Sequence, residues 1–136
     1  MPARRARSRG RPTSERGSSA VEFALLLPIL LMVLLALVQV GVLARDSLLL
    51  TQASRAGARE ASVQDSNDAV EQAVRGAAAA LAPERLSVDV VWGGQRGAPV
   101  TVSVAYEAPI ASLLSGWLLP ETVSLSASAT MRQEFA

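Results

Sequence analysis

The sequence predicts an α+β protein with a long N-terminal membrane helix that continues outside, a second helix and a small three-stranded antiparallel sheet. Three observations support this. An unbroken apolar segment begins at residue 23, helical patterns follow as far as residue 82, and from residue 86 apolar residues alternate with polar ones. We divide the chain into a basic leader (1–17), a transmembrane helix (18–45) and a head outside the cytoplasm (46–136).

The composition removes most kinds of catalysis. The 136 residues include no Cys and no His, and all 13 basic residues are Arg. This excludes thiolate nucleophiles, histidine bases, lysine Schiff bases and ordinary zinc sites. Carboxylates remain, but nothing in their spacing singles out Asp89 with Glu107, or Asp46 with Glu60, as a catalytic pair. We therefore expect no enzyme, no metal and no cofactor.

The leader is strongly basic. Residues 1–17 contain six Arg against one acidic residue, Glu15, and have almost nothing to bury, which is typical of a disordered segment. Such an arm can bind nucleic acid, or it can hold the N-terminus inside the cell beside a membrane segment. The apolar segment that follows favours the second reading, so we expect no nucleic-acid partner.

The apolar segment is long enough to cross a bilayer. Residues 23–38 are consecutively apolar, and Gln39 is the only strongly polar residue before Arg45. Residues 23–44 would extend roughly 33 Å as a helix, against a bilayer core of about 30 Å. A membrane helix tolerates Pro28. We expect a single pass with the N-terminus inside.

The helix is expected to continue outside the bilayer over residues 46–63. Ala53, Gly57 and Ala61 recur every four residues there, which makes a stripe of small side chains on one face. Such a stripe lets another helix approach closely. It could pack against the protein's own head or against another molecule, and the pattern does not decide between them.

A second helix is predicted over residues 68–82. Residues 65–68 form an N-cap cluster, with Asp68 and Glu71 spaced as in a capping box, and Pro83 ends the helix. One face is apolar, consisting of Val70, Val74, Ala77 and Leu81. A calcium loop would need an acidic ligand and a glycine where Ala69 and Val70 stand.

Three strands are predicted over residues 86–92, 99–106 and 122–131. The glycine-containing stretch 93–98 lies between two strands, so it predicts a hairpin and not a phosphate-binding loop. The apolar stretch 109–120 is too short to cross a membrane. We expect it to form a short helix that covers the sheet, with an exposed patch that meets the membrane or a neighbour as the alternative.

The junction between leader and apolar segment carries the most specific motif. A basic leader ends in Gly17, four residues follow, and Glu22 and the aromatic Phe23 then open the apolar segment. This arrangement resembles the processing site of TadE-like minor pilins of the tight-adherence (Flp) pilus, which are type IV pilin-like proteins. The similarity is sharp in the leader and first helix and loose beyond them. Major pilins of this system tend to have Tyr where Phe23 stands, which favours a minor component.

The resemblance implies roles for four residues. A prepilin peptidase would cut between Gly17 and Ser18, and Glu22, with Phe23 beside it, would serve subunit assembly by neutralising the new amine of a neighbour. Physical arguments support two of these roles. Gly17 has no side chain to hinder access to an extended bond, and a charge such as that of Glu22 is costly at the edge of a membrane helix and usually has a reason. The helix dipole alone also favours a glutamate there.

The implied function is that of a membrane-anchored minor pilin, or pseudopilin, in assembly of an adhesive pilus or a related secretion system. Implied partners are the peptidase, the membrane platform, the assembly ATPase and other pilins. Two fates fit equally well, incorporation into a surface pilus and retention in the cell membrane as an initiator. The alternative is a secreted soluble binding domain that an ordinary signal peptidase releases after Ala44, although the apolar segment exceeds the usual length of about 7–15 residues.

Overall fold

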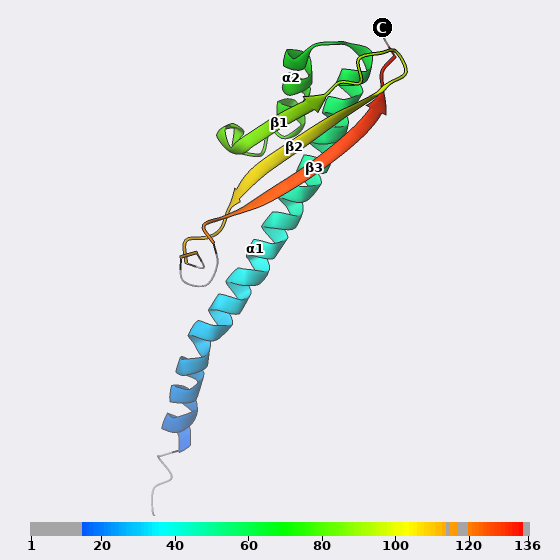
Figure 1. Ribbon diagram of the computed structural model, residues 1–136. Coiled ribbons are helices and arrows are strands. Elements are labelled where there is room, and N and C mark those ends of the chain that lie inside the picture. The colour runs from blue at the N-terminus through cyan, green and yellow to red at the C-terminus, as the bar shows by residue number, and fades with distance from the viewer. Residues whose placement is uncertain (1–14, 114, 117–119, 135–136) are drawn as a thin grey trace, which may run out of the picture. The chain divides into compact units, whose positions relative to one another are not determined.

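The computed structural model describes residues 15–113, 115–116 and 120–134. The chain divides into two units, Met1–Leu35 and Ala36–Ala136. Its elements are α1 (Glu15–Val63), α2 (Asn67–Ala77), the 3-10 helix η1 (Pro83–Arg85), β1 (Leu86–Val91), β2 (Pro99–Pro109) and β3 (Thr122–Arg132) (Figure 1). The architecture confirms the predicted α+β fold, with a long apolar helix, a second helix and a three-stranded antiparallel sheet.

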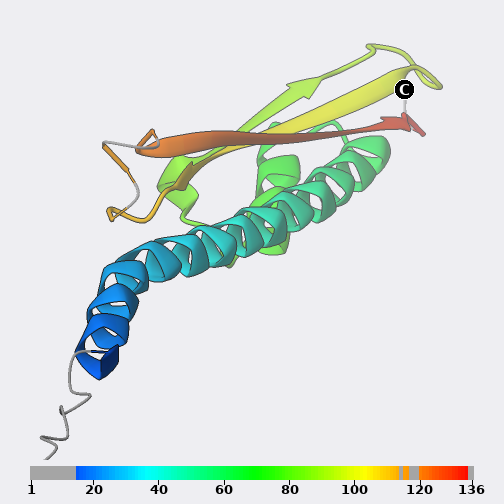
Figure 2. The ribbon, with the colours of Figure 1, turned by 90° about the horizontal axis from the view of Figure 1, so that it is seen from below.

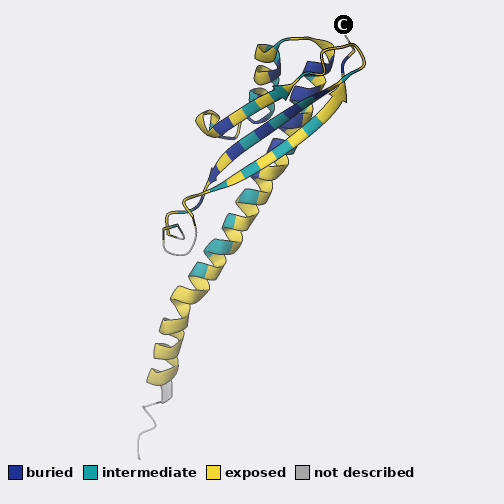
Figure 3. Cartoon of the chain, in the orientation of Figure 1, coloured by how far each residue is buried: buried dark blue, intermediate teal, exposed yellow. Residues whose placement is uncertain are grey.

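Helix α1 runs without a break through the boundary that we predicted at residue 45. It also begins earlier than expected. Residues 15–17, which we assigned to a disordered leader, are helical, while residues 1–14 lie outside the described part of the chain. The large apolar side chains between Val21 and Val42 are mostly exposed, whereas buried positions appear along α1 from Asp46 onward (Figure 3).

The sheet has the order β1-β2-β3, and both pairs are antiparallel. Val104 at the centre of β2 faces Val88 on one side and Ala127 on the other. The predicted hairpin joins β1 to β2, and Gly94 and Gly97 have positive φ angles in it, a conformation that glycine adopts at little cost. Strand β2 is longer than predicted because Pro109 is still paired with Thr122 of β3.

One face of the sheet packs on α1 and α2 (Figures 1 and 2). The buried core combines residues from both helices and from the central strand: Leu50, Ala53, Ala58, Ala61, Val70, Val74, Val100, Val102, Val104 and Tyr106. The opposite face of the sheet is rich in hydroxyl groups, and Thr101 and Thr130 share a hydrogen bond of 2.8 Å across it.

The small residues of α1 pack inside the protein's own head. Ala53 and Ala61 are fully buried. A methyl group on Gly57 would lie 2.6 Å from Val74 Cγ2 and 3.0 Å from Val102 Cγ1. Only glycine therefore allows α2 and β2 to approach α1 this closely. Of the two readings of the stripe, the structure supports intramolecular packing.

Helix α2 differs from its prediction at both ends. Its N-cap is Ser66, whose side chain accepts a hydrogen bond from the amide of Ala69 at 3.3 Å. The predicted capping box of Asp68 and Glu71 is wrong, because the helix begins one residue before Asp68. The helix ends at Ala77 and not near residue 82, although Val70, Val74 and Leu81 are buried as expected.

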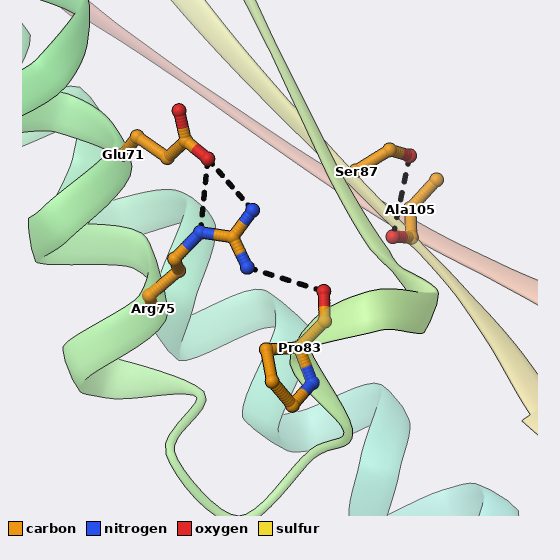
Figure 4. Close-up of polar contacts among 5 residues, drawn as sticks. All are labelled: Glu71, Arg75, Pro83, Ser87 and Ala105. Atoms are coloured by element: carbon orange, nitrogen blue, oxygen red, sulfur yellow. Dashed lines mark hydrogen bonds and ion pairs between the residues drawn. The ribbon is translucent and has the colours of Figure 1, made fainter.

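Arg75 holds the segment that follows α2 (Figure 4). Its Nε and Nη2 atoms donate to Glu71 Oε1 at 2.9 and 2.7 Å, and its Nη1 donates to the carbonyl oxygen of Pro83 at 3.1 Å. Glu71 thus pairs with Arg75 one turn later and caps nothing. The guanidinium group therefore links α2 directly to the turn that precedes β1. In β1 itself, Ser87 Oγ donates a hydrogen bond to the carbonyl oxygen of Ala105 in β2 at 3.5 Å.

The connector between β2 and β3 is not helical in its described residues. Ile110 is buried and Ala111 half-buried, whereas Ser112 and Leu113 are exposed in a turn. Residues 114 and 117–119 lie outside the described part of the chain. The short covering helix that we expected over 109–120 is therefore not seen where the connector is described.

We predict that replacing Gly57 is far more harmful than replacing Gly76, a helical glycine with nothing within 4 Å of an added methyl group. Both Gly→Ala changes gain helix propensity, but only Gly57→Ala forces a methyl group against buried valines. The difference in unfolding free energy between the two variants should be about 1–3 kcal/mol. Urea unfolding of the full chain in detergent, followed by circular dichroism, measures it, and equal stabilities would contradict this packing.

We also predict that Ser66→Ala lowers the unfolding free energy by about 0.5–2 kcal/mol, because it removes the N-cap acceptor. Asp68→Ala removes a first-turn charge but no cap, and it should cost less. The same unfolding assay compares the two variants. A larger loss of unfolding free energy from Asp68→Ala than from Ser66→Ala would instead support Asp68 as the capping residue.

Candidate processing and assembly site

The four residues that the motif singled out all lie in the first turns of α1. A methyl group built on Gly17 would meet nothing within 4 Å, so the space around this residue is open. Ser18, Glu22 and Phe23 are exposed. Ser18 Oγ donates a hydrogen bond to Glu22 Oε1 at 3.3 Å, since residues four apart lie on one face of a helix.

Gly17 is helical, which differs from the extended bond that we expected at a cleavage site. A peptidase that requires an extended substrate must therefore open the beginning of α1. This is the least stable part of the helix, because the first four amides of a helix lack partners within it. A glycine there lowers helix stability by about 0.5–1 kcal/mol relative to alanine, which makes opening easier.

Cleavage after Gly17 would change the electrostatics of this site. Ser18 would become the first residue and carry a positive amine, and Glu22 would then lie near the new N-terminus of the helix, where the helix dipole favours a carboxylate. The Ser18–Glu22 hydrogen bond places the two residues on one exposed face. The carboxylate can therefore interact with the amine of its own chain or with that of a neighbour.

The apolar segment beyond Glu22 has an exposed surface. Among the described residues, one helix is long and apolar enough to cross a membrane, and none of its most apolar window is buried. The core helix of a soluble protein of similar composition would instead be covered. Leu25 illustrates the exposure, since 69% of its surface is accessible.

Gln39 makes a contact that the sequence did not reveal. Its Nε2 donates to the carbonyl oxygen of Pro109, and its Oε1 accepts from the amide of Ala111, both at 3.2 Å. The sequence marked Gln39 only as a polar residue in an apolar segment. Its partners lie some seventy positions away, and no motif connects them to it.

The carboxylates considered as catalytic pairs lie apart. Asp89 faces Ser103 across the sheet, and Glu107 is four residues further along β2, about 13 Å away at the usual rise of a strand. Asp46 and Glu60 are about 21 Å apart along α1. Within the described residues, no three acidic side chains are grouped in a way that could hold a metal ion.

Comparison with known proteins finds a similarity in the N-terminal part of the chain. Residues 17–59, about a third of the chain, match the family model of TadE-like proteins, so this segment is similar to that family. The match begins at Gly17 and extends through the apolar part of α1 to the small residues that pack in the head. No curated protein and no solved structure matches the chain.

Proposed function

We propose that the protein is a membrane-anchored minor pilin, or pseudopilin, that takes part in assembly of a tight-adherence pilus or a related secretion system. The observation that carries the proposal is the TadE-like match, which begins at the glycine where the motif predicts cleavage. The exposed apolar surface of α1 supports it, since such a surface needs a membrane or other α-helices to cover it.

In this proposal the N-terminus stays inside the cell and the head lies outside. The basic leader and the apolar segment support this orientation, because Arg residues beside a membrane helix are retained in the cytoplasm. A prepilin peptidase cuts between Gly17 and Ser18, and Glu22 and Phe23 then serve assembly with other pilins. The membrane platform and the assembly ATPase are the remaining partners, and the protein itself has no catalytic role.

The chemistry of Glu22 gives the proposal its mechanism. An isolated carboxylate is costly at the edge of a bilayer, and pairing with the amine of a processed Ser18 lowers this cost. Within one chain that partner lies one turn away. In an assembly, the amine of an incoming subunit can supply the same charge, so subunits that lack Glu22 lose an attraction that guides their docking.

Release of a soluble domain after Ala44 fits the structure less well. α1 is continuous through this position, whereas a signal peptidase needs an accessible, extended bond. The cut would also remove Leu43, which packs against the core, and Gln39, which binds the β2–β3 connector. A released head would therefore lose contacts that belong to its own fold.

We predict that the mature protein in its native host begins at Ser18, and that Gly17→Leu blocks this cleavage. The space around Gly17 is open, so the larger side chain should leave the fold unchanged and act on the peptidase alone. Gly41→Leu is the matched control, because Gly41 is also helical with nothing within 4 Å of an added methyl group.

Mass spectrometry of the membrane fraction identifies the N-terminal residue. A chain beginning at Arg45 would instead establish the secreted domain. A chain that keeps its leader in the presence of an active prepilin peptidase would contradict the pilin-like role.

We further predict that Glu22→Gln preserves cleavage but reduces pilus assembly. The amide keeps the size and polarity of the side chain but loses the charge that attracts an amine. Glu22→Asp should restore part of the function, since it returns the charge on a shorter side chain. Quantification of surface pili, with the N-terminus of each variant verified, provides the measurement, and full assembly with Glu22→Gln would exclude the charge-pairing role.

A further inference from the structure

We infer that residues 109–113, where the connector between β2 and β3 begins, are a second membrane contact, which lies in the outer leaflet of the bilayer at the depth of Gln39. The inference rests on the proposed function, because it requires α1 to span the membrane. It assigns a lipid-facing role to a segment of the head far from the N-terminus in sequence. The residues that carry it are Gln39 and residues 109–113.

The first line of evidence is the depth of Gln39 along α1. Gln39 lies six residues before Arg45, the next charged residue, which corresponds to about 9 Å of helix. A span that begins just after Glu22 needs about 20 residues to cross the bilayer core, so it includes Gln39 in its outer part. A head segment that binds Gln39 directly must therefore reach the same depth.

The second line of evidence is that Gln39 satisfies backbone groups of the connector. The carbonyl of Pro109 and the amide of Ala111 both bond to its side chain, and the amide of Ile110 donates to the carbonyl oxygen of Glu121 at 2.9 Å. In hydrocarbon a backbone group without a partner costs several kcal/mol, so non-helical backbone is tolerated at membrane depth only where the protein satisfies it. In water these groups would need no such partner.

The third line of evidence is the chemistry of the connector surface. Leu113 is 68% exposed, which lies within the range of 42–69% for the exposed leucines between Leu25 and Leu37 of α1. Residues 108–120 contain no charged side chain, and charges return only at Glu107 and Glu121 on the two flanks. An exposed leucine on an uncharged turn is a surface that lipid can cover at the depth of Gln39.

The chain is well suited to a test because it contains no cysteine. Single cysteines are introduced into the full chain as Leu113→Cys, Leu31→Cys and Arg96→Cys, and each is labelled with the fluorophore NBD. The proteins are reconstituted in phosphatidylcholine–phosphatidylglycerol vesicles with lipids that carry a doxyl quencher near the headgroup or deep in the acyl chain. Leu31 reports the spanning helix, and Arg96, in the β1–β2 hairpin, reports a part of the head in water.

We expect the label at position 113 to be quenched several-fold more strongly than that at position 96, and most by the shallow quencher. Quenching equal to that at position 96, with position 31 strongly quenched by the deep lipid, would overturn the connector contact and leave the anchor intact. An unquenched label at position 31 would overturn the anchor and the connector contact together. A blue-shifted label at position 113 that no lipid quenches would assign the surface to a protein neighbour and overturn the lipid contact.

The positioning role of Gln39 is tested in the same vesicles. Gln39→Ala should reduce quenching at position 113 without changing quenching at position 31, because only the connector loses its hydrogen bonds. Gln52→Ala, an exposed glutamine of α1 further from the membrane, is the matched control. Unchanged quenching at position 113 with Gln39→Ala would exclude Gln39 as the residue that holds the connector at this depth.

Discussion

The close approach of α1 to α2 and β2 at Gly57 is the contact on which the head depends. A side chain as small as a methyl group at this position would collide with Val74 and Val102, both fully buried. The alanines one turn away on either side, Ala53 and Ala61, extend the same narrow surface. Because interiors are packed at nearly crystalline density, this narrow stripe sets the distance at which α2 and the sheet can lie over α1.

Helix α1 carries two kinds of surface on one continuous backbone. Its described residues before Ala36 offer apolar side chains that are mostly exposed, and its residues after Asp46 supply the small face of the head. The TadE-like match includes both stretches. The composition of the helix changes accordingly, from large aliphatic side chains that favour lipid to Ala, Gly and Ser that permit close packing.

The elements with strong local signals were predicted well, and those that depended on a choice among similar residues were not. The strands and the hairpin followed from alternation and from glycines, since both are properties of neighbouring residues. The predicted N-cap of α2 was wrong because Ser66 and Asp68 are both good capping residues, and the sequence alone does not choose between them. The short helix predicted after β2 is not seen in the described residues of the connector, because an apolar run of that length fits a helix or a turn equally well.

The sequence by itself determined the apolar helix, the order of elements, the two-faced sheet and the motif from Gly17 to Phe23, because each is encoded in the spacing of nearby residues. Only the tertiary structure decided that the small stripe packs inward and that Gln39 bonds to Pro109 and Ala111. Both are contacts between segments distant along the chain, and a single sequence carries no local signal for which distant partner a side chain meets. The physical reason is that burial and hydrogen bonding are satisfied in space, whereas periodicity records only which face of one element is apolar.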